Sequence, residues 1–515
     1  MSLFASYPAS DGDHSVLSAV AASGRGGDAA ARGRIDEIVF SHLSKAGIIP
    51  AALSSDEVFL RRVYLDAIGT LPTAQQAAAF LASKDPGRRK ALIDELLQRD
   101  EYSVYWAMKW SDLLRIKAEF PINLWPIAAQ EYYRWLLDSL QKNKPYDQFA
   151  RELLTSSGSN FRVGQVNFFR ALQNREPQSV AQAAALTFMG VRTEKWTATQ
   201  RSAMAVCFSQ VGYKPTGEWK EEIVFYDRSK TLATADAVFP DGTKIRLQAG
   251  RDPRMDFADW LTGPRNPYFA RNIVNRIWAW LYGRGIIDEP DDIRPDNPPL
   301  YPDLLGFLEA ELVSSGYDLK HIYRLILNSN TYQLSSFPRS AKPEATKHFA
   351  SYPVRRLDAE VLIDALNQIT GTSEQYSSAV PEPYTIMPSG ERAIALPDGS
   401  ISSPLLELFG RSPRNTGMES ERNNRPTAAQ RLHLLNSSQI ERRIEQGPAL
   451  QAIYGKSDPQ AVLTSLYLTI LSRYPTDAEV KIAASYAHDS GLNRRQAAVD
   501  VAWALINSSE FLYRH

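Results

Sequence analysis

The chain is almost free of cysteine: its 515 residues include one, Cys207. A single thiol excludes an internal disulfide, a zinc site built from several cysteines, and a haem held by two thioether bonds. Cys207 lies in the apolar run Met204–Phe208, where we expect a buried and unreactive thiol. The chemistry of this protein must therefore come from other side chains.

Long apolar runs and an excess of one charge are also missing. No run reaches the roughly 18 apolar residues of a membrane-spanning helix, so we expect no membrane span. Lys plus Arg and Asp plus Glu number 58 each. Such a balanced chain has no long-range positive field, so nucleic acid is not expected as a partner. We interpret the pairs Arg61–Arg62 and Arg442–Arg443 as solvated helix faces.

Targeting and catalytic signatures are absent as well. Residues 1–33 have no basic start and no long apolar stretch, so they show no signal peptide and predict a flexible lead-in. The seven histidines are scattered, and none lies close enough to another histidine or to the cysteine for a zinc helix. The chain has no nucleophile elbow, phosphate-binding loop or dinucleotide fingerprint. No cofactor is therefore predicted, and whether the protein is an enzyme stays open.

What the chain does contain is helical periodicity along most of its length. Ser54, followed three residues later by Glu57, predicts a capping box at the start of a helix that Gly69 ends. A stripe of large residues at helical spacing then predicts a helix packed in the core: Tyr102, Trp106, Trp110 and Leu113.

Strand-like alternation interrupts this pattern in Glu221–Tyr226 and Thr243–Leu247, and a weaker patch of the same kind covers residues 393–401. We therefore predict a mainly α protein with two helical domains and a small β-insert between them. The expected divisions are a lead-in at 1–33, an N-terminal helical domain at 34–226, a β-rich connector at 227–255 and a C-terminal helical domain at 256–515.

An acidic loop follows the first helix of the second half. Asp291, Asp292 and Asp296 lie within it and offer the hard oxygen ligands that calcium prefers, so they are candidate metal ligands. The loop lacks the spacing of an EF-hand. Arg294 in the same loop favours the alternative of a rigid surface loop held by ion pairs.

A tryptophan among acids is the best match to a sugar site. Trp219 is a candidate binding residue because an aromatic face stacks on the C–H bonds of a sugar ring, and Glu218 and Glu221 are candidate proton-transfer groups. Adjacent residues of a strand point to opposite faces, so Glu221 and Glu222 are predicted to diverge. The alternative is a set of structural acids on a half-exposed strand.

Two polar groupings in the second half are further candidates. Arg271 and Asn275 lie four residues apart on one helix, beside Arg276, and could hold an oxyanion or simply bond to neighbouring helices. The segment Glu419–Pro426 precedes a helix start at Thr427, where ligands often bind. Within it, Glu421 is a candidate catalytic acid, and Arg422 and Arg425 are candidate binding residues.

Several stretches together resemble a two-domain family found in planctomycetes and related bacteria, whose halves are domains of unknown function that occur beside cytochrome modules. In the first half these are Phe59–Asp66, Gly69–Thr73 and Tyr105–Leu114, and in the second half Asn266–Arg271, Asn275–Trp278, Gly283–Ile286, Asp291–Pro295 and Asn507–Leu512. Many relatives carry a Cys-x-x-Cys-His haem motif after the segment that is 183–192 here. This chain continues from Arg192 into Thr193, so it resembles a branch without c-type haem.

The resemblance implies a periplasmic or extracellular protein that acts on or beside complex polysaccharide, including sulfated polysaccharide. Its expected partners are carbohydrate or another secreted protein. Two alternatives remain open: a non-catalytic scaffold that binds a partner, and an enzyme of unrecognised class. The enzyme's site would lie between the two domains and use Arg271, Arg276, Glu421 and Arg425.

Overall fold

The computed structural model of the chain describes residues 29–515 except 120, 123, 231–234, 249 and 388. Residues 1–28 of the predicted lead-in lie outside the described residues. The protein is mainly α-helical, as predicted. No helix in the described ranges has the length and apolar character needed to cross a membrane.

The N-terminal half is a succession of short and medium helices. They are α2 (Arg34–Lys45), α3 (Asp56–Ala67), α4 (Ala74–Ala82), α5 (Arg88–Leu96), α6 (Asp100–Leu113), α7 (Pro126–Gln141), α8 (Tyr146–Thr155), α9 (Pro177–Met189) and α10 (Ala198–Val206), with 3-10 turns η1 (Gly164–Phe169) and η2 (Thr193–Lys195).

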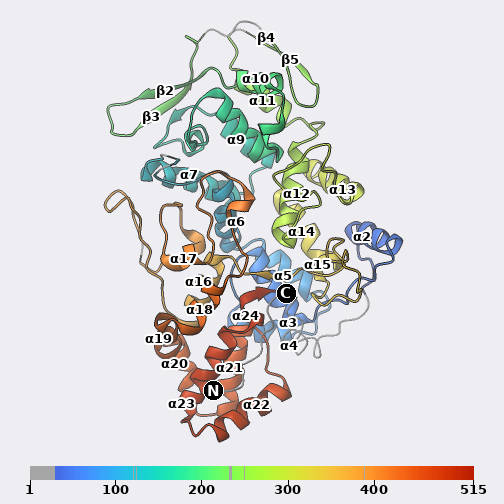
Figure 1. The fold of residues 1–515 in the computed structure, drawn as a ribbon, viewed down its shortest axis with the longest axis vertical. Coiled ribbons are helices and arrows are strands. Elements are labelled where there is room, and N and C mark those ends of the chain that lie inside the picture. Colours follow the sequence, from blue (N-terminus) through green and yellow to red (C-terminus); the bar gives the residue numbers. More distant parts are fainter. Residues whose placement is uncertain (1–28, 120, 123, 231–234, 249, 388) are drawn as a thin grey trace.

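Two small sheets lie at one end of the molecule (Figure 1). β1 (Gly158–Ser159), β2 (Val211–Pro215) and β3 (Glu222–Tyr226) form an antiparallel sheet in the order β1-β3-β2. β4 (Ala235–Val238) pairs with β5 (Lys244–Leu247). The sequence located β3 and β5. β3 pairs with β1, and both strands lie within residues 34–226, the predicted N-terminal domain.

The C-terminal half is again helical and ends in a two-stranded ladder. Its elements are α11 (Pro253–Leu261), α12 (Phe269–Tyr282), α13 (Pro302–Ser314), α14 (Leu319–Asn328), α15 (Asn330–Gln333), β6 (Arg355–Arg356), α16 (Ala359–Thr370), η3 (Ala393–Ala395), α17 (Pro404–Leu408), η4 (Glu419–Glu421), α18 (Ala428–Asn436), α19 (Ser438–Gln446), α20 (Pro448–Tyr454), α21 (Pro459–Leu471), α22 (Asp477–Asp489), α23 (Arg494–Ile506), α24 (Ser509–Leu512) and β7 (Tyr513–Arg514). The strand expected at 393–401 is wrong, because its first residues form the 3-10 turn η3.

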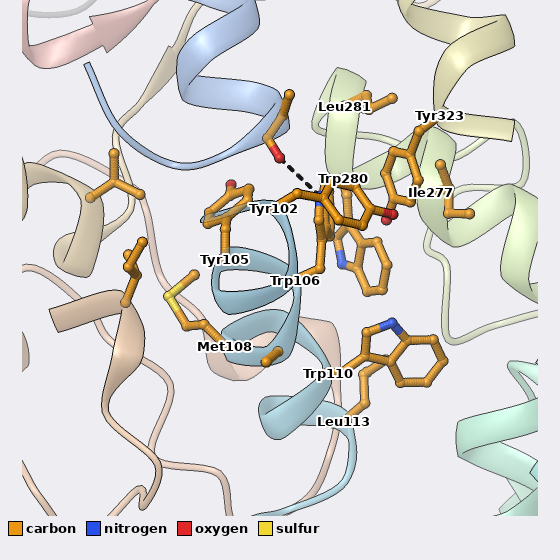
Figure 2. Packing of buried hydrophobic residues seen from close by; sticks show 14 of the residues in the cluster. Tyr102, Tyr105, Trp106, Met108, Trp110, Leu113, Ile277, Trp280, Leu281 and Tyr323 are labelled. Carbon is orange, nitrogen blue, oxygen red and sulfur yellow. Dashed lines mark hydrogen bonds between the residues drawn. The ribbon is translucent and has the colours of Figure 1, made fainter. Parts of the chain in front are cut away.

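One hydrophobic core runs through both halves. The predicted aromatic stripe of α6 lies at its centre and is buried, as expected. Figure 2 shows Trp106 among Trp280 of α12 and Tyr323 of α14, with ring centroids 5.2 Å and 4.4 Å away. Its indole N–H also donates to the carbonyl of Ala67, 3.1 Å away. Since these rings come from both halves, the halves share a single packed interior.

Helix α3 connects the two halves through buried arginines. Arg61 and Arg62 are 2% and 1% exposed, so their interpretation as a solvated face is wrong. Arg61 donates to the carbonyls of Ile470 and Phe511 at 2.8 and 2.9 Å, and Arg62 donates to that of Tyr332 at 2.7 Å. The arginines thus donate hydrogen bonds to backbone carbonyls near the ends of distant helices. Because these bonds replace those to water, the two charged side chains can be buried. The second pair is mixed, because Arg443 bonds to Glu374 whereas Arg442 is exposed.

The start of α3 also differs from the prediction by one residue. Ser55, rather than Ser54, is the N-cap, and its hydroxyl accepts from the backbone N–H of Val58. The predicted capping box is therefore wrong, and no hydrogen bond or ion pair within the described residues occupies the side chain of Glu57. The helix ends before Gly69, as predicted, since that residue adopts a φ of +61° that glycine tolerates.

Candidate functional site

A buried network of charged side chains crosses the seam between the two halves. α6 contributes Lys109 and Asp112, and the C-terminal half contributes the rest: Asp358, Glu360, Arg411, Arg414, Arg422 and Arg514. All of these residues are buried or nearly so. We call this set the charge network.

Arg422 is the hub of the charge network. Its guanidinium contacts Asp112 at 2.7 Å and Glu360 at 2.6 Å. One planar group thus joins a carboxylate of the first half to one of the second, in the two-pronged geometry that arginine favours. Arg422 is a predicted binding residue. In the described structure its guanidinium pairs with these two carboxylates of the protein itself.

Asp358 gathers the remaining charges. Lys109 lies 3.1 Å and Arg514 3.0 Å from its Oδ2 atom, and Asn424 donates to its Oδ1 atom. Burial alone would raise the pKa of Asp358, but Lys109, Arg514 and Arg422 hold it well below its usual range. The carboxylate is therefore ionised at neutral pH, which a stable buried ion pair requires.

Next to this network, Arg276 of α12 forms its own buried pair with Asp291, at 2.5 Å. The other oxygen of Asp291 accepts the backbone N–H of Glu419 at 2.7 Å. Asn275 fastens the segment after α12 by exchanging two hydrogen bonds with the backbone of Ile287. These candidates brace loops against α12. Their described contacts are all with protein groups, although the Nε and Nη1 atoms of Arg276 are buried without a hydrogen-bond partner.

The other candidates of the interdomain enzyme hypothesis lie apart. Arg271 pairs with Glu309 of α13 at 2.7 Å, and Arg425 is exposed on its loop. Glu421 accepts backbone N–H groups of residues 415, 416 and 417 at 3.0 to 3.3 Å, closing the turn before η4. Within the described part of the chain, no hydrogen bond or ion pair joins any two of the four predicted residues, and the enzyme hypothesis stays a prediction.

In the acidic loop, arginines occupy the carboxylates. Asp292 and Asp296 both pair with Arg294, at 3.0 and 2.7 Å, and Asp291 faces Arg276. Within the described ranges, no group of three or more His, Cys, Asp or Glu side chains could hold a metal ion.

A different kind of site lies on the surface near the β2–β3 turn. Three aromatic rings from separate segments meet there: Trp125 before α7, Trp219 in the turn, and Tyr384 between α16 and η3. Trp125 lies 4.6 Å from Trp219 and 5.3 Å from Tyr384, centroid to centroid. Trp219 is 64% and Tyr384 48% exposed. We call these three rings the aromatic cluster.

Charged groups border the aromatic cluster on the side of the turn. Arg162 lies 3.8 Å from Glu218 and 3.6 Å from Glu221, and the ammonium of Lys220 lies 5.6 Å from the Trp219 ring centroid. The hydroxyls of Ser159 and Thr216 donate to Glu221 and lower its pKa. Such a carboxylate stays ionised, whereas a general acid for glycoside cleavage needs a raised pKa. Glu222 points elsewhere and pairs with Arg170.

The sequence identified one ring of the aromatic cluster and missed two. Trp219 stood out because of the acids around it, but Trp125 precedes a proline in an apolar stretch and Tyr384 lies in a segment without periodicity. Only the fold brings these positions together. A local signal was present in Pro381–Pro383, because a proline-rich segment predicts an exposed loop.

Two known families match most of the chain. Residues 34–208 match PSCyt2, described as a protein of unknown function (DUF1549), and residues 253–487 match PSD1, described as a protein of unknown function (DUF1553). The chain therefore belongs to the planctomycete-type two-domain family that the sequence resembles. No curated protein and no solved structure matches it. Because both descriptions leave the function open, it has to be inferred from the residues of this chain.

Proposed function

We propose that this protein binds complex carbohydrate outside the cytoplasm through the aromatic cluster. The observation that carries the proposal is the exposure of Trp219 and Tyr384 in a group of three rings. Large aromatic side chains normally gain free energy by burial. A group of them held in solvent on different segments is typical of a surface that binds a ligand with apolar faces.

The chemistry around the rings favours carbohydrate over a purely apolar partner. A sugar ring presents C–H groups to an aromatic face and hydroxyls at its edge, and Glu218, Arg162 and Lys220 supply hydrogen-bonding groups beside Trp219. The cations also suit sulfate esters, which carry charged oxygens. The low pKa of Glu221 supports binding rather than cleavage at this place.

The test is native gel electrophoresis in gels containing xylan, dextran or sulfated carrageenan. We expect at least one polysaccharide to retard the protein, and Trp219→Ala and Tyr384→Ala to weaken that retardation about tenfold, equivalent to about 1.4 kcal/mol. Tyr486→Ala, which removes an exposed ring on α22, is the matched control and should behave as the unchanged protein. Arg162→Gln should weaken binding to carrageenan alone.

Two results would overturn the proposal: no retardation by any of the three polysaccharides, or retardation that Trp219→Ala leaves unchanged. If the aromatic cluster docks a protein partner instead, the first of these results is expected. The same gels therefore separate the carbohydrate hypothesis from the scaffold hypothesis.

A further inference from the structure

A second concave site lies on the seam between the halves, remote in sequence from the aromatic cluster. Residues from the start of α3 and from α21 to the end of the chain enclose a pocket of about 200 Å³. Figure 1 shows α3 beside α24 and the adjoining end of α21 at this place. We call it the seam pocket. A pocket of this size is on the scale of one small ring molecule.

The wall of the seam pocket contains one buried donor with a free position. Arg61 uses its two terminal nitrogens on the carbonyls of Ile470 and Phe511, whereas its Nε atom is buried and has no partner. No carboxylate lies within ion-pair distance of Arg61 in the described part of the chain. A buried donor of this kind normally has a partner, and the pocket is where a ligand could supply one.

Residues with acceptor groups line the same pocket. Glu57 has no hydrogen-bond or ion-pair partner among the described residues, because the capping box that would occupy it does not form. His515 is buried and neutral at pH 7, since burial lowers its pKa to about 4. Its Nδ1 lies 3.2 Å from the carbonyl oxygen of Tyr513 and must donate to it, so Nε2 keeps its lone pair.

Acidic and basic side chains are equal in number in the lining of the pocket, two of each, so the side chains favour neither a simple anion nor a simple cation. Glu510 is engaged by two nitrogens of Arg473, at 2.6 and 2.8 Å, and Arg61 offsets Glu57. Arg61 offers a single N–H rather than the fork that carboxylates and sulfates prefer. At the rim, Tyr474 is 46% exposed and presents an aromatic ring.

We propose that the seam pocket binds a small uncharged polyhydroxylated molecule, such as a polyol or a single sugar ring. One hydroxyl can accept from the Nε–H of Arg61 and donate to Glu57, a second can donate to Nε2 of His515, and the ring of Tyr474 covers the C–H groups. This site stands on its own residues and does not depend on the aromatic cluster being a binding surface.

The test is saturation-transfer NMR on the full chain with D-glucose, D-galactose, D-xylose and myo-inositol, each added alone. We expect at least one of them to bind, and both Tyr474→Ala and Glu57→Gln to weaken binding about tenfold. Ile482→Ala, which shortens an exposed apolar side chain on α22 outside the lining of the pocket, is the control and should have no effect on binding. Circular dichroism should show all variants folded.

The proposal is overturned if none of the four compounds binds, or if either Tyr474→Ala or Glu57→Gln leaves binding unchanged. Tighter binding of D-glucuronate or L-serine than of every neutral compound would also overturn it, because the ligand would then be charged. Trp219→Ala should leave this binding intact and Glu57→Gln should leave polysaccharide retardation intact, so the two sites succeed or fail separately.

Discussion

Asp358→Asn tests whether the charge network holds the halves together. The substitution keeps the shape of the side chain but removes the charge that faces Lys109 at 3.1 Å and Arg514 at 3.0 Å. It also replaces one accepting oxygen by an N–H₂ group, which cannot accept a hydrogen bond from the donors around it. Breaking a buried ion pair by removing one partner costs about 3–5 kcal/mol, because the other charge stays buried without compensation. We expect a loss of this size in the free energy of unfolding.

The assay is urea unfolding at pH 7, followed by tryptophan fluorescence and by circular dichroism. Asp296→Asn is the matched control, since that carboxylate is exposed and pairs with Arg294 on the surface; it should cost less than about 1 kcal/mol. Adding Lys109→Met to Asp358→Asn should cost less than the sum of the two single changes, because the orphaned ammonium is gone. A loss below about 1 kcal/mol for Asp358→Asn would refute the reasoning.

The same network gives a pH dependence of known sign. The pKa values of Asp358 and Glu360 are lowered in the folded protein. The unfolded chain therefore takes up protons first as the pH falls below about 4. The stabilisation from these acids is complete above that range and is lost as the pH falls through their lowered pKa values. Asp358→Asn should flatten this acid limb of the stability curve.

Two further predictions concern single positions. His515→Gln should reduce the loss of stability between pH 6.5 and 4. The folded pKa of His515 is about 4, so the unfolded chain binds a proton first as the pH falls, and roughly 3 kcal/mol of stability that is complete above pH 6.5 is lost across this range. An unchanged slope of stability against pH, measured by urea unfolding at several pH values, would contradict this. Gly69→Ala should lower the free energy of unfolding by about 2–4 kcal/mol, since φ is +61° and the added methyl would lie 2.3 Å from the Tyr105 ring. Thermal unfolding at pH 7 measures this loss. A loss below about 1 kcal/mol would argue against strain at this turn.

The helices and the core could be predicted because their signal is local. Burial of the α6 stripe follows from spacing within one helix, since Tyr102, Trp106 and Trp110 repeat at intervals that share a face. The end of α3 at Gly69 follows from the left-handed backbone that glycine allows. In each of these cases, the residues that determine the outcome lie within one or two helical turns.

The buried arginines could not be predicted, because their partners are backbone carbonyls far away in the chain. Arg61 donates to the carbonyl of Ile470, 409 residues later. No sequence pattern around α3 predicts this contact. The same limit applies to the candidate sites. Trp219 carried a local signal. Tyr384 joins the aromatic cluster only through a contact across 165 positions, since its centroid lies 6.3 Å from that of Trp219. The strand expected at 393–401 failed because short apolar alternation also suits a 3-10 turn.

The residues that make the family recognisable and the residues that form the proposed sites are largely different sets. Arg61, Arg62 and Asp66 belong to the stretch that resembles the family, and their contacts are with the other half of the protein. Trp219 lies between the matched regions 34–208 and 253–487, and His515 lies after the second. Each proposed site therefore joins residues of the matched framework to at least one residue outside it. The contacts of the matched stretches show how the halves fit together, whereas the ligand has to be determined by binding measurements on this chain.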